Sequence, residues 1–153
     1  MQILLDADSC PKEARIMLLR FSSRLRIKTI FAANRIIPAL PDTVQIELCP
    51  QGEGAADNRI VELARPGDLV ITRDLPLAER LVEAGVTVLD DRGRVFTKEN
   101  IKEQRSVRDF VVGLAENGLD IERIPSYGKK ELKSFAASLD RELSRLRKNP
   151  PHS

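Results

Sequence analysis

The amino-acid sequence predicts an α/β fold, with a single domain built on a mostly parallel central sheet and helices on both faces. Short apolar runs alternate with segments whose apolar residues recur every three or four positions, as strands alternating with amphipathic helices do. The 153 residues, 42% hydrophobic and 31% charged, suffice for one core and leave little room for a second domain. We expect the domain to cover residues 1–148 and residues 149–153, with two prolines, to be disordered.

Three strands are expected in the first part of the chain, at residues 3–5, 27–33 and 44–48. A helix over residues 11–25 follows the first strand, with Pro11 at the first helical position, where a missing N–H costs nothing. The third strand alternates in polarity and follows two prolines, so it should lie near the sheet edge.

The second part repeats this alternation. Two further strands are expected at residues 69–72 and 86–89. Helices are expected at residues 55–64, around residues 77–82, from 98 to about 117, and from about 129 to 148. Asp74 and Thr97 are the expected N-caps of two of these helices. Right-handed crossovers then favour a strand order of about 3-2-1-4-5.

Carboxylates follow the central strands of this sheet. Asp6 and Asp8 come directly after the first strand, Asp74 follows the strand at 69–72, and Asn34 ends the second strand. The predicted order reverses beside the first strand, where ligands bind in open α/β sheets. Asp57, in the first turn of the helix at 55–64, can reach the same crevice.

A cluster of carboxylates without histidine or paired cysteines favours Mg²⁺ or Mn²⁺ over zinc. The one histidine, His152, lies in the expected tail. Such ions activate water and stabilise charge on phosphorus, so we expect phosphodiester hydrolysis. For each aspartate alone, a capping or turn role is the alternative.

The net charge is +2, but basic residues gather in places. Glu13 is the one acid between Pro11 and Lys28, a stretch that is otherwise rich in lysine and arginine. This pattern suits binding to a phosphate-rich partner such as a nucleic-acid backbone. It equally suits a solvated helix face. The candidate backbone contacts are Lys12, Arg15, Arg73, Lys129 and Lys130.

No stretch of the sequence has the length and apolarity of a membrane span, and Asp6 and Asp8 interrupt the apolar N-terminus. The two cysteines, Cys10 and Cys49, are too few for a disulfide framework, so we expect free thiols. We therefore expect a cytoplasmic protein that makes no membrane contact.

Several motifs together resemble the YaiI/YqxD family of uncharacterised bacterial proteins, over roughly residues 1–145. They lie at residues 6–11, 33–34, 56–57, 67–78, 92–93 and 108–109. That family is grouped with PIN-like domains, so the resemblance implies a PIN-like fold with acidic residues arranged as in metal-dependent nucleases. By position it implies Asp6 and Asp74 as metal-binding and catalytic acids, Asp57 as the middle acid, and Asp8 as a family-specific addition.

The resemblance does not supply a demonstrated substrate. We expect RNA or structured nucleic acid, contacted by Asn34, Asn58 and Thr72 beside these acids. The chain departs from the family pattern in two places. Asn58 stands where a second aspartate is usual, so one charge is lost and a two-metal arrangement is doubtful. Asp90 and Asp91 stand where Asn-Pro is usual; Asp91 either compensates for that charge or, as we expect, lies in a solvated turn.

Three alternatives remain open. A strand ending in Asp-x-Asp also opens haloacid-dehalogenase-like phosphatases, but the later serine or threonine, lysine and acidic pair do not follow in the required order. Cys10 near Lys12 and Arg15 has the surroundings of a reactive thiolate, although a structural thiol is favoured. A non-catalytic nucleic-acid-binding module fits the basic residues, with Tyr127 as the one plausible base-stacking side chain.

The last helix carries a heptad-like apolar stripe. Its members are Leu132, Ala136, Leu139, Leu143 and Leu146. Such a stripe more often packs on its own domain, and it is also the best candidate for a homodimer contact.

Overall fold

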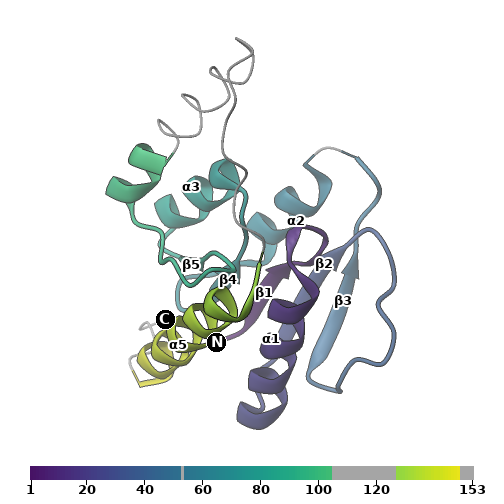
Figure 1. The fold of residues 1–153 in the computed structure, drawn as a ribbon. Helices are drawn as coiled ribbons and strands as arrows, with labels where there is room; N and C mark the ends of the chain where they lie inside the picture. Colours follow the sequence, from purple (N-terminus) through teal and green to yellow (C-terminus); the bar gives the residue numbers. More distant parts are fainter. Residues whose placement is uncertain (53, 105–126, 149–153) are drawn as a thin grey trace, which may run out of the picture.

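The computed structural model describes residues 1–52, 54–104 and 127–148. Its centre is a five-stranded sheet in which every pairing between strands is parallel, in the order β3-β2-β1-β4-β5 (Figure 1). The strands are β1 (Ile3–Asp6), β2 (Thr29–Ala33), β3 (Val44–Leu48), β4 (Leu69–Ile71) and β5 (Thr87–Leu89). The predicted α/β class and strand order are confirmed.

Helices follow the strands and cover both faces of the sheet (Figure 1). Their bounds are α1 (Lys12–Leu25), α2 (Ala55–Leu63), α3 (Leu75–Glu83) and α5 (Lys129–Lys148), and a 3-10 turn, η1 (Ala7–Ser9), lies between β1 and α1. Residues 98–104 are also helical. The rest of the helix expected to reach residue 117, and the expected disordered tail, lie outside the described residues. The extent of the domain stays a prediction.

Alternation along the strands divides the core into two layers. Ile3 and Leu5 face α1 and α5, where they pack with Leu18 and Phe135. Leu4, between them, faces α2 and α3. Because every residue of β1, β2 and β4 is buried, these strands read as continuous apolar runs, as expected for the interior of a parallel sheet.

The outermost strand β3 is only partly buried, which agrees with the predicted edge position. Of the helix starts predicted from the sequence, that of α1 differs in detail and that of α3 agrees. Pro11 is the N-cap of α1, one residue before the expected position, because the turn η1 intervenes. Asp74 caps α3 as predicted, since its Oδ1 accepts the N–H of Leu77 at 2.9 Å.

The apolar stripe of α5 packs inside the domain. Leu139, Leu143 and Leu146 are buried in the layer that α5 shares with α1, and Ala136 packs against the same cluster. The expected packing of this stripe on its own domain is therefore confirmed for these residues, and a homodimer contact through α5 stays a prediction. Within the described residues, no helix combines the length and apolarity needed to span a bilayer.

Candidate functional site

Asp6 ends the central strand β1 and is only 7% exposed. Its Oδ2 accepts hydrogen bonds from Ser9 Oγ at 3.0 Å and from Thr72 Oγ1 at 3.2 Å. Burial raises the pKa of Asp6, and the nearby charges of Asp74 and Asp8 raise it further, while the two hydroxyl hydrogen bonds act in the opposite direction. Asp6 is thus a buried acid held by two neutral donors and surrounded by other acids.

Thr72, directly after β4, links two of these acids. It is 2% exposed, donates to Asp6, and accepts the backbone N–H of Asp74 at 3.0 Å. Predicted as a substrate contact, Thr72 is buried, and its hydroxyl fixes the chain between Asp6 and Asp74.

Asp57 reaches the same edge from the first turn of α2. The pKa of Asp57 is raised to about 6, first by burial and then by the charges of Asp74 and Asp6. A hydrogen bond with Asp74 also favours the protonated form of Asp57. Asp6, Asp57 and Asp74 therefore share one electrostatic environment. This agrees with the prediction from the strand-end positions of Asp6 and Asp74 and from the place of Asp57 in the first turn of a helix.

Asp8 lies at the margin of this group. It is exposed, and its Oδ2 accepts the backbone N–H of Asn34 at 3.0 Å. Asp8 thus ties the turn after β1 to the end of β2, and it is the backbone of Asn34, not its side chain, that makes this contact.

Asn58 is exposed, and its Oδ1 accepts a hydrogen bond from Arg80 Nη1 at 3.1 Å. The charge of Arg80 lowers the pKa of Asp57, against the larger effects that raise it. Asn58 therefore binds an arginine through its amide oxygen, and the positive charge of Arg80 lies beside the acidic group.

The interpretation of Asp91 as part of a solvated turn is wrong. Asp91 is 2% exposed and forms an ion pair with Arg73 Nε, so its carboxylate points into the protein. Burial raises the pKa of Asp91, whereas Arg73 opposes that shift. Arg73, predicted as a substrate contact, keeps 46% of its side chain exposed but is oriented by this pair. The sequence held one signal for this placement, because Asp91 follows the end of a predicted strand, as Asp6 and Asp74 do.

The thiol of Cys10 does not have the properties of a nucleophile. Burial raises its pKa to about 12, because nearby Arg73 and Arg15 do not offset desolvation. Both cysteines are free, as expected. Tyr127 is partly buried against the α1 and α5 layer, and its hydroxyl is enclosed without a hydrogen-bond partner among the described residues. This placement does not suit base stacking.

The other predicted cationic contacts lie at the starts of two helices. Lys12 is exposed and Arg15 partly exposed in the first turns of α1, and Lys129 and Lys130 are exposed at the start of α5. Neither pair is buried by the fold, so all four side chains remain accessible from solvent.

A cavity of about 270 Å³ opens at the acidic edge, lined by Asp6, Ser9, Arg73, Asp74 and Leu75. Carboxylates and hydroxyls are the ligands that Mg²⁺ and Mn²⁺ take, and a divalent cation would relieve the repulsion that raises these pKa values. In the part of the chain that the structure describes, no three His, Cys, Asp or Glu side chains already stand together as a metal-binding group. The residues thus fit the ion by chemistry and charge, without a preassembled set of ligands.

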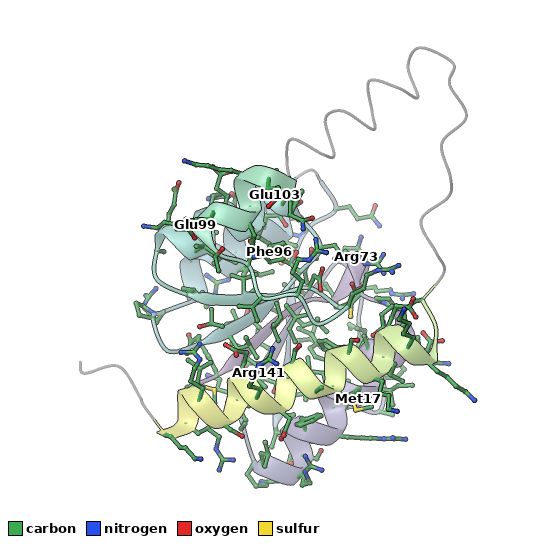
Figure 2. The ribbon with its side chains drawn as sticks, turned by 60° about the vertical axis from the view of Figure 1, so that its left-hand side comes forward. Met17, Arg73, Phe96, Glu99, Glu103 and Arg141 are labelled. Carbon is green, nitrogen blue, oxygen red and sulfur yellow. The ribbon has the colours of Figure 1, made fainter. Side chains whose placement is uncertain are left out.

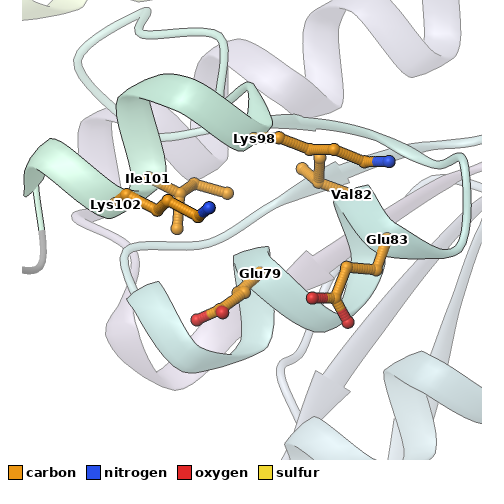
Figure 3. Close-up of a pocket in the computed structure, with 6 residues that line it drawn as sticks. All are labelled: Glu79, Val82, Glu83, Lys98, Ile101 and Lys102. Carbon is orange, nitrogen blue, oxygen red and sulfur yellow. The ribbon is translucent and has the colours of Figure 1, made fainter.

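A second cavity, of about 180 Å³, lies between α3 and residues 98–104 (Figure 3). Glu79 and Glu83 line it from α3, and Lys98 and Lys102 line it from the facing helix. None of the predicted site residues lines this cavity, and its opposite charges give it no preference for an anionic substrate.

Known proteins similar to this chain support the family resemblance. The model of the family described as "Uncharacterized BCR, YaiI/YqxD family" matches residues 4–145. A UPF0178 protein of Myxococcus xanthus is 43% identical over 153 residues, which cover 99% of each protein. A UPF0178 protein of Treponema denticola is 44% identical over 148 residues, 97% of this chain and 95% of that protein. No solved structure matches the chain.

Proposed function

The chain belongs to the YaiI/YqxD family, and we propose that it is a PIN-like nuclease that hydrolyses phosphodiester bonds of RNA or structured nucleic acid with Mg²⁺ or Mn²⁺. The single observation that carries this proposal is the gathering of Asp6, Asp57 and Asp74 at the carboxyl edge of the sheet. Asp6 and Asp74 line one cavity there, and burial and their charges raise the pKa of Asp57 to about 6. Ionisable groups that repel one another and have shifted pKa values are typical of functional sites. We further propose that the protein acts in the cytoplasm.

Asp6, Asp57 and Asp74 would hold the ion, with Asp8 at the margin of the site. The bound ion would supply an activated water and would stabilise negative charge at phosphorus. Ser9 and Thr72 fix the carboxylate of Asp6 through their hydroxyls. With a pKa of about 6, Asp57 is partly protonated at slightly acidic pH when it is not ligating, so cation binding there would release protons.

Arg73 has a separate role in this proposal. Its side chain borders the acidic cavity, where a free guanidinium would pair with Asp6 or Asp74 and compete with a cation. The ion pair with Asp91 engages this guanidinium and so limits its competition with a cation. In that position Arg73 is suited to contact a non-bridging oxygen of the phosphate.

The test is calorimetric titration with Mn²⁺ and Mg²⁺ at neutral pH and low salt, on the wild type, on Asp6→Asn and on Asp42→Asn. Asp42 is an exposed aspartate paired with Arg26, so it is a matched control. We expect binding that Asp6→Asn abolishes and Asp42→Asn leaves intact. Metal-dependent cleavage of RNA should then fall by more than about a hundredfold in Asp6→Asn, because loss even of a ligand's hydrogen-bond partner costs about 10–100-fold.

If Asp6→Asn cleaves RNA as fast as the wild type does, Asp6 has no part in the mechanism. Nucleic-acid binding without metal binding or cleavage would instead support a non-catalytic binding module. That second candidate is favoured by a groove on the protein that three arginine side chains line, Arg92, Arg94 and Arg141.

A further inference from the structure

A groove of about 630 Å³ lies between the turn that follows β5 and the helix α5. Arg92 and Arg94 line it from the turn, and Arg141 lines it from α5. Figure 2 shows α5 crossing the view with Arg141 on it, and Arg73 beyond the helix on the side of the sheet. The groove is distinct from the acidic cavity, whose lining residues it does not share.

The turn is fixed in place against α5. Gly93 has φ +89°, and a Cβ at this position would lie 2.5 Å from the backbone oxygen of Ser134, so only glycine permits the contact. Ser138 Oγ donates a hydrogen bond to the carbonyl of Gly93 at 2.6 Å. The two walls of the groove are thereby held together before any ligand arrives.

The single acid that lines the groove is occupied by the turn itself. Asp90 Oδ1 accepts the backbone N–H of Arg92 at 2.9 Å and that of Arg94 at 2.8 Å. This internal capping orients the carboxylate toward the backbone of the turn, and the two arginine side chains project from the same segment.

Arg94 and Arg141 retain charge for a ligand. Arg94 is exposed, and within the described residues it forms no ion pair. Arg141 keeps 64% of its side chain exposed, with Glu142 at 3.6 Å, and Glu142 is bound more closely by Arg145 at 2.9 Å. Arg92 lies 3.8 Å from Glu131, an ion pair at long range.

We infer that this groove, defined by Arg92, Arg94 and Arg141, binds the phosphate backbone of a nucleic-acid strand and leads it to the acidic edge. The inference rests on the proposed function for the identity of the ligand. The turn connects the two places, because Asp91 pairs with Arg73 on one side while its neighbour Arg92 lines the groove on the other. No aromatic side chain is among the residues that line the groove, so binding should depend on phosphates and not on base identity.

The experiment measures binding of a fluorescein-labelled 20-nucleotide oligouridylate by anisotropy, in EDTA, between about 20 and 200 mM salt. The wild type is compared with the triple variant Arg92→Gln, Arg94→Gln, Arg141→Gln. The matched control loses three exposed charges elsewhere, through Arg20→Gln, Lys28→Gln and Arg147→Gln. Circular dichroism checks that all proteins are folded, and the single variant Arg94→Gln adds a minimal change at an exposed position.

We expect the triple variant to bind at least about tenfold more weakly than the wild type. The slope of log affinity against log salt should fall by about 2, because each phosphate contact on a single strand contributes about 0.7. The control should change affinity by less than about twofold, and Arg94→Gln should have a smaller effect in the direction of the triple variant.

Equal affinity of the triple variant and the control would overturn the inference, as would a wild type that binds no oligouridylate at the lowest salt. Asp6→Asn separates this inference from the proposed nuclease activity. If that variant binds like the wild type and neither protein cleaves, the groove stands and the nuclease proposal fails.

Discussion

Two buried aspartates lie at opposite ends of the central strands, and their surroundings differ. Asp68 precedes β4 at the amino end of the sheet and is 6% exposed. It accepts the backbone N–H groups of Gln2 and Arg65 and the side-chain amide of Gln2, at 2.9 to 3.1 Å. Every contact is with a donor, so Asp68 joins the start of β1 to the start of β4.

Asp6, at the carboxyl end, is equally buried but has only two hydroxyl donors, and Asp74 and Asp8 repel its charge. A buried carboxylate that is satisfied by N–H groups holds the fold together. One that is poorly satisfied and close to other acids costs folding free energy, which function can recover through a cation. The comparison separates structural from functional acids without reference to sequence motifs.

The largest effect on folding is expected for Asp68→Ala. Removing this carboxylate leaves buried N–H groups without acceptors, so the free energy of unfolding should fall by about 3 kcal/mol. Urea denaturation measures this, with Asp42→Ala as the control, because the Arg26–Asp42 pair is exposed and should contribute less than about 1 kcal/mol. A loss of free energy of unfolding for Asp68→Ala no larger than that for Asp42→Ala would contradict the structural role assigned to Asp68.

Asp91 should fall between the two cases. Its carboxylate is buried but has one charged partner, Arg73, whose side chain is 46% exposed and remains solvated when the partner is lost. Asp91→Asn should therefore cost about 1–2 kcal/mol. In a double-mutant cycle with Arg73→Gln, the two losses should be less than additive; additive losses would mean that the ion pair contributes nothing.

The pH dependence of stability tests the acidic edge directly. Since the pKa of Asp57 rises from 3.8 unfolded to about 6 folded, the folded state binds more protons between these values. The stability that protonation provides is present below pH 3.8 and is lost as pH rises through about 6. Urea unfolding of wild type and Asp57→Asn from pH 4 to 7.5 should show that the variant lacks this part of the decline. Parallel curves would contradict the assigned pKa.

The smallest effect on folding is expected for Asp6→Asn. The asparagine oxygen can still accept from Ser9 and Thr72, and the repulsion from Asp74 and Asp8 disappears. The free energy of unfolding should change by less than about 1 kcal/mol, or increase. Thermal and urea unfolding measure it, and a loss comparable to that of Asp68→Ala would make Asp6 a structural residue.

The fold was largely predictable because its signals are local. The bounds of α5 follow from its apolar spacing, and the cap at Asp74 follows from the residue type before a helix. The strand order follows from short crossovers between buried apolar strands. The meeting of Asp6 and Asp74 follows in turn, since parallel neighbouring strands end at the same edge.

The partners of the polar side chains were less predictable, because they depend on tertiary packing. Asp91 pairs with Arg73 eighteen positions earlier, and Asn58 pairs with Arg80 across two helices. The arginine-lined groove exists only because α5 packs on Gly93, more than forty positions away. No period or cap in the sequence signals such contacts.

The central position of β1 has a consequence for how the chain acquires its structure. β1 pairs with β2 on one side and with β4 on the other, and Ile3 aligns with Leu69. One edge of β1 therefore stays unpaired until β4, some sixty residues later, has been synthesised. One face of the sheet is covered only when α5 has been made. Parallel pairings of this separation slow folding, so the nascent chain should leave this edge of β1 unpaired on the ribosome until β4 has been synthesised.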